Sequence, residues 1–343
     1  MNTPKLLNFA SENYAGVQED MMKAIAEANT GHVGSYGNDP ITAEAIAVMK
    51  QHFGDDIDVY FAFNGTGANN FGLSSATKRY DAIYCTEVAH IYVDESTAPE
   101  AFTGCRIYII KSKDGKIDPE ALKASLGRKG DVHHPQPGVV SITQPTEYGT
   151  VYSLDEIKAL KEICQENGML LHVDGARFFN AVAKLGVSLK QMTEHMDILT
   201  LGGTKAGMMF GEAVIFFNQK TPGQFRFQLK RSMQLASKNR FISAQFKRML
   251  QDNLWHDLAV YTNQLAKQFE KEIAAVPAIK IAYPVETNAA FITMSKSMYE
   301  KVQHHARFYY WNDEREEARL IFAFNNTPAE VTEFVQVLSD LSK

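Results

Sequence analysis

Two strand-like runs of the sequence end in polar turns whose side chains could do chemistry. "LHVDGAR" (171–177) places Asp174 and Arg177 at the end of the first run, and "ILTLGGTKAG" (198–207) places Lys205 after a glycine turn in the second. In a parallel α/β sheet, ligands bind outside the carboxyl ends of the strands, so we expect these side chains at one site. Taken singly, Asp174 also fits a helix cap, and Arg177 and Lys205 also fit solvated surface residues.

The lysine and the aspartate together indicate one kind of cofactor. A lysine just past a buried strand, flanked by glycine and alanine, is placed where desolvation lowers its pKa and makes its amine nucleophilic. Pyridoxal 5'-phosphate needs such a lysine for a Schiff base, and it needs a carboxylate that keeps the pyridine nitrogen protonated. We therefore predict that Lys205 and Asp174 bind pyridoxal 5'-phosphate.

The cofactor also needs a phosphate cup and a flat group against its ring, and the sequence offers a candidate for each. "FNGTGANN" (63–70) joins a strand-like run to a helix-like run, so the backbone N–H groups around Gly65 and the hydroxyl of Thr66 can bind an anion. "CTEVAHIYVDE" (85–95) puts His90 past another strand end, where an imidazole can lie over a ring. Glycine-rich turns and single histidines are also common as purely structural features.

Seven short runs rich in β-branched and aromatic residues predict the sheet that positions these turns. They are "IDVYFAFN" (57–64), "RYDAIYC" (79–85), "RIYIIKS" (106–112), "GVVSITQ" (138–144), "MLLHVD" (169–174), "ILTLGG" (198–203) and "EAVIFF" (212–217). Most are continuously apolar, which is typical of strands covered on both faces. Helix-like stretches alternate with them, and capping boxes mark helix starts at Ser153 and Thr327. We predict an α/β fold with a mainly parallel seven-stranded sheet.

The pattern changes after the last of these runs. Residues 221–274 predict a long helical connector, and the shorter strand-like pieces "KIAYPV", "AAFITMS" and "RLIFAF" predict a small α+β domain. We place the boundary near residue 250. Residues 1–250 then form a large cofactor-binding domain with an N-terminal segment and a connector helix, and residues 251–343 form the small domain.

Composition narrows the class of protein. The 343 residues are 45% hydrophobic and 22% charged, with a net charge of -5, so no basic surface for nucleic acid or an anionic membrane is expected. The sequence has three scattered cysteines, no signal-like N-terminus and no long apolar run. These features favour a cytoplasmic protein without disulfides. The pairs His133–His134 and His304–His305 lack metal-ligand spacing, so we expect surface histidines and no metal.

These motifs resemble the threonine aldolase and β-eliminating lyase family of fold-type-I pyridoxal phosphate enzymes. The resemblance rests on "HVDGARFFNA", "LGGTKAG", "GNDP" (37–40), "NGTGANN" and "AHIYVDE", in the same order, and runs to about residue 335. It implies an aspartate aminotransferase-like large domain with a small C-terminal domain. It also implies active sites shared between subunits of a homodimer or homotetramer.

The resemblance assigns roles to individual residues. Lys205 would carry pyridoxal 5'-phosphate, Asp174 would pair with its pyridine nitrogen and His90 would stack on its ring. Gly65 and Thr66 would bind the phosphate. Arg177, Arg319 in "EEARLIFAF" and Ser11 in "FASENYAG" match family positions that contact the substrate carboxylate, and Arg177 is among the cofactor contacts too. Lys238 would be a phosphate ligand donated by a neighbouring subunit, and Tyr36 would lie near the same interface.

One segment departs from the family pattern. Where many members carry a histidine in a "THNN"-like segment, this chain reads "ITQPTEYGTVY" (142–152), so no histidine aligns. His90, alone or through a water, is then the leading candidate for the base that takes the β-hydroxyl proton.

The predicted activity is cleavage of L-threonine or L-allo-threonine to glycine and acetaldehyde, with phenylserine-like substrates also accepted. Two alternatives stay open. Another lyase or an aminotransferase on the same fold would keep Lys205 and Asp174 and change the substrate groups. A catalytically silent binding protein on this fold is the other, although the intact lysine and aspartate argue against it.

Overall fold

The computed structural model describes residues 6–217 and 225–343, and its large sheet contains the seven predicted strands. They are β2 (Ile57–Ala62), β3 (Asp81–Thr86), β4 (Arg106–Ile110), β7 (Gln136–Thr143), β8 (Leu170–Gly175), β9 (Ile198–Gly202) and β10 (Glu212–Phe217). In space their order is β2-β10-β9-β8-β7-β3-β4. β10 runs antiparallel to both of its neighbours and the other pairs are parallel, which confirms a mainly parallel sheet.

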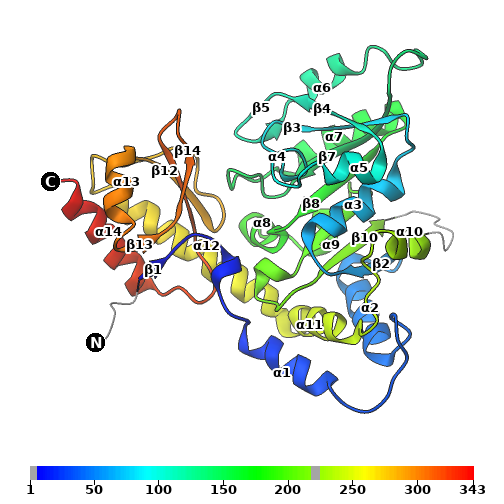
Figure 1. Cartoon of the computed structure of the whole chain (residues 1–343), viewed down its shortest axis with the longest axis horizontal. Helices are drawn as coiled ribbons and strands as arrows, with labels where there is room; N and C mark the ends of the chain where they lie inside the picture. The colour runs from blue at the N-terminus through cyan, green and yellow to red at the C-terminus, as the bar shows by residue number, and fades with distance from the viewer. Residues whose placement is uncertain (1–5, 218–224) are drawn as a thin grey trace.

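Strand β10 illustrates why the runs are continuously apolar. Val214 and Phe216 pack on one face with Phe71, whereas Ala213 and Ile215 join the larger core on the other face. Helices cover both faces of the sheet (Figure 1). On the Phe71 side lie α3 (Gly65–Ala76), α5 (Ala98–Thr103) and α10 (Phe225–Arg231). The larger core includes side chains of α1 (Glu19–Ala28), α2 (Pro40–Phe53), α6 (Pro119–Ser125), α7 (Leu154–Asn167), α8 (Phe178–Leu185), α9 (Leu189–Thr193) and α11 (Arg240–Leu250).

Both predicted capping boxes form. The Ser153 side chain caps α7, and the Glu156 side chain accepts the Ser153 backbone N–H. Thr327 and Glu330 do the same for α14 (Pro328–Leu341), whose first residue is a proline. In each box two N–H groups that have no partner within the helix are satisfied.

The stretch predicted as one helical connector contains three helices, and its residues 221–224 lie outside the described part. α11 ends at Leu250, and α12 (Leu254–Ile273) begins after a short 3-10 turn, Gln251–Asn253. Asp252 and Asn253 have φ values of 53° and 56°, in the left-handed region that breaks a helix. α12 then runs from the large unit along the smaller one (Figure 1).

The smaller unit is built on an antiparallel sheet in the order β11-β12-β15-β14. These strands are β11 (Lys280–Ile281), β12 (Ala289–Thr293), β14 (Tyr309–Asn312) and β15 (Glu317–Ile321), and α13 (Lys296–Val302) and α14 accompany them. The N-terminal segment, which we assigned to the large domain, lies here: β1 (Leu7–Asn8) pairs with β13 (Ala306–Arg307), and Leu7 and Phe9 join the small core. The boundary near residue 250 stays a proposal.

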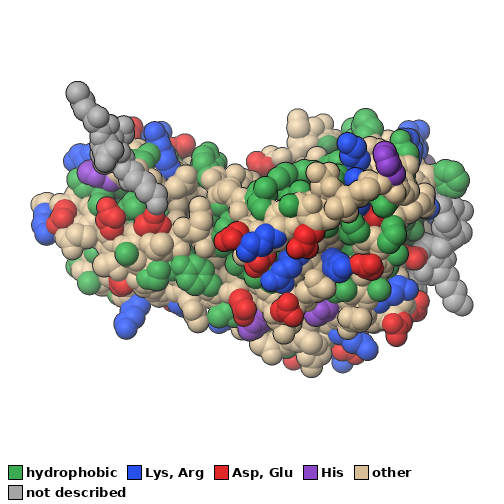
Figure 2. Space-filling view, turned by 90° about the horizontal axis from the view of Figure 1, so that it is seen from below, with side chains coloured by type: hydrophobic (Ala, Val, Ile, Leu, Met, Phe, Trp, Pro, Cys, Tyr) green, Lys and Arg blue, Asp and Glu red, His purple; other side chains and the backbone are tan. Residues whose placement is uncertain are grey.

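The surface carries both signs of charge. In Figure 2 lysine and arginine side chains are interspersed with acidic ones across the centre of the face. All three cysteines are buried and unpaired. Within residues 6–217 and 225–343, no helix is long and apolar enough to cross a membrane, and no group of three potential metal ligands occurs.

Candidate active site

Five of the predicted site residues line one cavity at the carboxyl ends of β7, β8 and β9. The cavity is lined by Gly65, Asn69, His90, Thr143, Pro145, Glu147, Asp174, Ala176, Arg177 and Lys205. Of these, Gly65, His90, Asp174, Arg177 and Lys205 were predicted. They come from four separate segments, which the sheet and the amino ends of α3 and α4 (His90–Val93) bring together.

Lys205 is in the 3-10 turn Thr204–Ala206 that follows β9, and its amine makes no hydrogen bond or ion pair with a described residue. Burial lowers the pKa of Lys205, and the positive charge of Arg177 adds to this effect. A less hydrated amine is more often neutral and therefore nucleophilic. The geometry agrees with the amine chemistry predicted for this lysine.

Glycines and a buried glutamate shape the turn that holds Lys205. A Cβ on Gly202 would lie 2.4 Å from the Ala176 oxygen, so only glycine lets the tips of β8 and β9 approach this closely. Glu212 accepts hydrogen bonds from the Gly203 N–H at 2.8 Å and from the Thr204 hydroxyl at 2.8 Å. Burial raises the pKa of Glu212 to about 7. Sequence reasoning missed Glu212, which begins the next strand.

Asp174 is fixed from two sides. One carboxylate oxygen accepts the Ala176 N–H at 3.0 Å, which is the local turn contact expected of a capping residue, and the other accepts the Asn69 amide at 2.9 Å. The same Asn69 nitrogen donates to Glu95 at 2.9 Å, and Glu95 lies 2.8 Å from Nδ1 of His90. Asp174 and His90 are thus connected through two residues that the sequence analysis quoted but did not select.

The contact with Glu95 favours the protonated form of His90. The hydrogen bond to Glu95 raises the pKa of His90, against the opposing effect of burial. Since Glu95 is buried, it holds the ring orientation as well as the proton on Nδ1. A histidine of raised pKa is protonated over a wider range of pH, so near neutral pH fewer of its rings have a nitrogen free to accept a proton.

Arg177 is not free, contrary to the simplest picture of a substrate-binding arginine. Its Nε and Nη2 donate to the two carboxylate oxygens of Glu12 at 2.6 and 2.8 Å, and Asn288 also donates to Glu12 at 2.8 Å. Glu12 is buried and follows Ser11, whose hydroxyl oxygen accepts the Asn13 N–H. Nη1 of Arg177 makes no hydrogen bond within the described residues, so that part of the guanidinium can still bind an anion.

Arg319, on β15, differs from Arg177 in having no carboxylate partner among the described residues. Its guanidinium packs over the rings of Trp311 at 4.3 Å and Tyr309 at 5.2 Å, and its buried Nε has no hydrogen-bond partner among the described residues. Burial lowers the pKa of Arg319 to about 10, and the nearby charge of Arg177 contributes. A partly buried guanidinium without a carboxylate partner is suited to binding an anionic ligand.

The predicted phosphate turn begins helix α3. Asn64 caps the helix by accepting the Gly67 N–H, and Gly65 and Thr66 are the first helical residues. A Cβ on Gly65 would meet no atom within 4 Å, so the backbone there is open. The unpaired N–H groups of such a helix start attract anions.

The other five predicted residues are not among those that line this cavity: Ser11, Tyr36, Thr66, Lys238 and Arg319. Lys238 is exposed just before α11, and Tyr36 lies beside it, because the Tyr36 N–H donates to the Ser237 carbonyl at 3.0 Å. Neither residue lines the cavity. Glu147 also lines the cavity, although the sequence analysis did not select it. It lies in the quoted segment "ITQPTEYGTVY", in which no histidine aligns.

Comparison with known proteins finds relatives that match nearly the whole chain. Residues 8–297 match the model of the family described as beta-eliminating lyase. The chain is 41% identical over 311 residues to a low specificity L-threonine aldolase of Pseudomonas sp. (strain NCIMB 10558), covering 90% of each protein. It is also 41% identical over 305 residues to a low specificity L-threonine aldolase of Pseudomonas aeruginosa, covering 88% of each.

A solved structure with the same overall arrangement is a threonine aldolase of Leishmania major. It is similar with a TM-score of 0.93 and 27% identity, and the match covers 98% of this chain and 100% of that one. The overall fold is therefore that of a known enzyme.

Proposed function

The chain belongs to the beta-eliminating lyase family, and from this membership we propose that it is a pyridoxal phosphate-dependent aldolase that cleaves L-threonine and L-allo-threonine to glycine and acetaldehyde. The observation that carries the proposal is the unpartnered amine of Lys205 in the same cavity as the fixed carboxylate of Asp174. Relatives at 41% identity that are named low specificity L-threonine aldolases support the substrate class.

The donor set fits the cofactor. Lys205 would carry pyridoxal 5'-phosphate, Asp174 would face its pyridine nitrogen, and His90 would lie against its ring. The open start of α3 at Gly65 and Thr66 suits the phosphate. When bound, the cofactor supplies an electron-withdrawing ring that takes up the charge left at Cα after the Cα–Cβ bond breaks.

In this proposal the substrate carboxylate binds between two guanidinium groups. Arg319 offers unpaired N–H donors, and Arg177 offers Nη1 while Glu12 holds its other edge. Ser11 would lie near them, because the next residue, Glu12, pairs with Arg177. Recognition of the shared glycine portion alone explains why more than one β-hydroxy amino acid would be accepted.

The proposal is tested by incubating the purified protein and pyridoxal 5'-phosphate with L-threonine, L-allo-threonine and L-serine. We expect acetaldehyde and glycine in equal amounts from the first two substrates. Pyruvate with ammonia would indicate a β-eliminating lyase, and a keto acid formed only with an added acceptor would indicate an aminotransferase. Folded protein that binds no pyridoxal phosphate would refute the proposal.

We expect Arg319→Gln to lower kcat/KM for L-threonine by about 10²-fold, because a buried charge partner is worth about 2–5 kcal/mol. Arg319→Lys keeps the charge and loses the planar fork, so it is expected to recover only part of the loss. Steady-state kinetics measure both variants, and Arg307→Gln, at an exposed arginine of β13 in the small unit, is the control. An unchanged kcat/KM in Arg319→Gln would exclude this arginine from carboxylate binding.

The assembly and location are further parts of the proposal. We propose a cytoplasmic homodimer or homotetramer in which Lys238 reaches the cofactor phosphate of a neighbouring subunit. Exposed apolar side chains near the site support an interface there, since Phe63, Met209 and Phe210 are 38%, 41% and 36% exposed. Tyr36, beside Lys238, would lie at the same interface.

A further inference from the structure

The segment between β7 and α7, residues 144–152, is a closed loop that brings one carboxylate to the cavity. Glu147 is at the turn of this loop and lines the cavity together with His90, Asp174 and Lys205. None of the roles assigned above uses Glu147. The question is what an acidic side chain does there.

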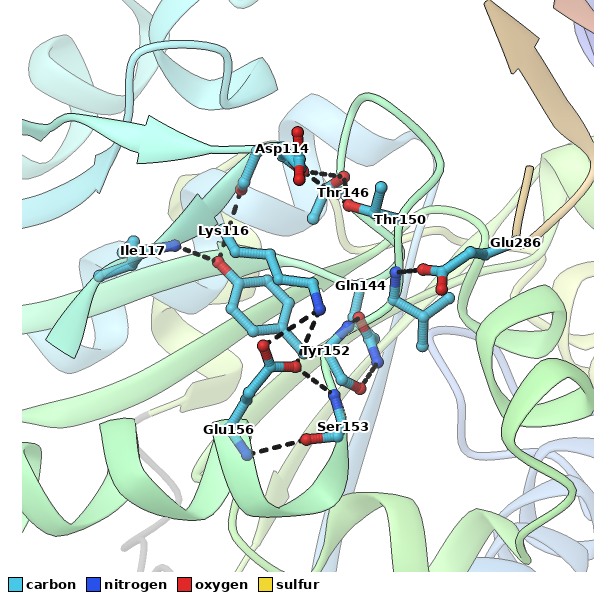
Figure 3. A network of polar contacts seen from close by, with 12 residues as sticks. Asp114, Lys116, Ile117, Gln144, Thr146, Thr150, Tyr152, Ser153, Glu156 and Glu286 are labelled. Atoms are coloured by element: carbon cyan, nitrogen blue, oxygen red, sulfur yellow. Dashed lines mark hydrogen bonds and ion pairs between the residues drawn. The ribbon is translucent and has the colours of Figure 1, made fainter. Parts of the chain in front are cut away.

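The base of the loop is held by a dense set of hydrogen bonds (Figure 3). The Gln144 side chain accepts the Tyr152 N–H at 3.0 Å and donates to the Tyr152 carbonyl at 2.9 Å. Above it, the Thr146 N–H donates to the Thr150 carbonyl at 2.8 Å, and the two threonine hydroxyls lie 2.7 Å apart. The Thr150 hydroxyl also donates to the Asp114 carbonyl at 2.6 Å. The loop is therefore closed on itself on both sides of Glu147.

The loop is also tied to the small unit. The Val151 N–H donates to Glu286 at 2.7 Å (Figure 3), and the Thr287 hydroxyl donates to the Gly149 carbonyl at 3.0 Å. Tyr148, the neighbour of Glu147, stacks on Tyr283 with ring centroids 4.2 Å apart. With so many fixed neighbours, Glu147 has little freedom to leave the cavity edge.

No partner neutralises this carboxylate. Glu147 makes no hydrogen bond or ion pair with any described residue, although the residues around it are held by the bonds above. Burial raises the pKa of Glu147, the negative charge of Asp174 adds to the effect, and nearby positive charges oppose it. The charged groups that face it are Asp174 from β8, His90 from α4, Lys205 from the turn after β9, Arg177 before α8 and Arg319 from β15.

His90 is the other candidate for proton transfer, but its contact with Glu95 keeps the ring protonated to higher pH, and a protonated ring cannot accept the proton. Its Nδ1 is occupied by Glu95 at 2.8 Å, an interaction that favours the protonated ring. An unpaired carboxylate with a raised pKa is better matched to accepting a proton near neutral pH. The two groups thus have different tasks, with His90 positioned against the cofactor ring.

We propose that Glu147 is the catalytic base that takes the proton of the substrate's β-hydroxyl, an inference that rests on the proposed aldolase function. The hydroxyl O–H bond breaks and its proton goes to a Glu147 carboxylate oxygen. The Cβ–O bond becomes the C=O of the aldehyde, and the Cα–Cβ electron pair goes to Cα. Cα then takes up one proton to give glycine, and Glu147 releases one proton, so the balance closes.

The test compares two reactions of Glu147→Gln, which removes the base and keeps the shape of the side chain. Aldehyde release from L-threonine is expected to fall by about 10²-fold or more. The second reaction is exchange of the glycine Cα proton in D₂O, which is followed by ¹H NMR. It needs the cofactor and Lys205 but no β-hydroxyl, so its rate is expected to stay within about threefold of wild type. Glu162→Gln, at an exposed glutamate of α7, is the matched control.

A third measurement does not depend on turnover. In cofactor-free protein labelled with ¹³C at glutamate carboxyls, the signal absent from Glu147→Gln is expected to titrate above the ordinary pKa of 4.5. Equal loss of both reactions in the variant would assign Glu147 to cofactor binding and overturn the inference, and so would unchanged aldehyde release. Wild-type protein that exchanges glycine but releases no aldehyde would instead refute the aldolase function itself, and the role of Glu147 with it.

Discussion

Lys205→Ala is expected to lower acetaldehyde release from L-threonine by about 10³-fold or more, while the protein stays folded. The physical reason is that Lys205 supplies an amine that nothing else in the cavity can replace. It is the lysine that lines the cavity, its pKa is lowered by burial, and no described residue neutralises it. Because it makes no hydrogen bond, its removal leaves no buried polar group without a partner, so stability should change little.

A second measurement identifies the attachment site independently of activity. Borohydride reduction of the protein with pyridoxal 5'-phosphate, followed by digestion and mass spectrometry, should label the peptide that contains Lys205. The label should be absent in Lys205→Ala and present in Lys184→Ala, which changes an exposed lysine of α8. Labelling of another lysine in the wild-type protein, or full aldehyde release by Lys205→Ala, would contradict the assignment.

The sheet and the two central residues of the site were accessible from the sequence because both depend on local patterns. A strand that is covered on both faces must be apolar throughout, so each of the seven runs stands out in the sequence. A polar residue directly after such a run has to lie at the sheet edge, and this rule located Asp174 and Lys205. The antiparallel direction of β10 leaves no such signal, since strand direction is decided by neighbours distant in sequence.

The parts of the site that were missed all depend on contacts between distant segments. Asn69 touches Asp174 across 105 positions, and Glu12 touches Arg177 across 165. No spacing rule connects such residues, and an asparagine or a glutamate alone carries no chemical signature. Glu147 had one weak signal, because it lies in the segment where a histidine was sought and a second kind of base was not considered.

The ion pair between Glu12 and Arg177 has the other large expected effect, on stability. Their side chains are 3% and 14% exposed, and both oxygens of Glu12 accept from the guanidinium. Removing one partner of a buried pair leaves an uncompensated charge, which costs about 3–5 kcal/mol. We expect Glu12→Ala to lower the free energy of unfolding at pH 7 by that amount, measured by urea unfolding at fixed protein concentration.

The stability that the Glu12–Arg177 pair contributes should depend on pH. Burial alone would raise the pKa of Glu12, but the charge and hydrogen bonds of Arg177 outweigh it and lower the pKa from 4.5 to about 2. A carboxylate with a lowered pKa stabilises the fold fully above its unfolded pKa, and the stabilisation disappears as the pH falls from about 4.5 to about 2. The stability difference between wild type and Glu12→Ala should therefore be constant above pH 5 and shrink below it.

A double-mutant cycle separates the ion pair from the loss of packing. If the pair carries the effect, Glu12→Ala with Arg177→Ala will be less destabilised than the sum of the two single variants, because neither charge is then left alone. Additive losses would mean that the pair contributes little and that Glu12 acts through Asn288, which donates to the same carboxylate. Glu12 also holds Nε and Nη2 of Arg177. Under the proposal that Nη1 of Arg177 binds the substrate carboxylate, Glu12→Ala should raise the KM for L-threonine more than it lowers kcat. A loss confined to kcat would show that Arg177 serves the bond-breaking step rather than substrate binding.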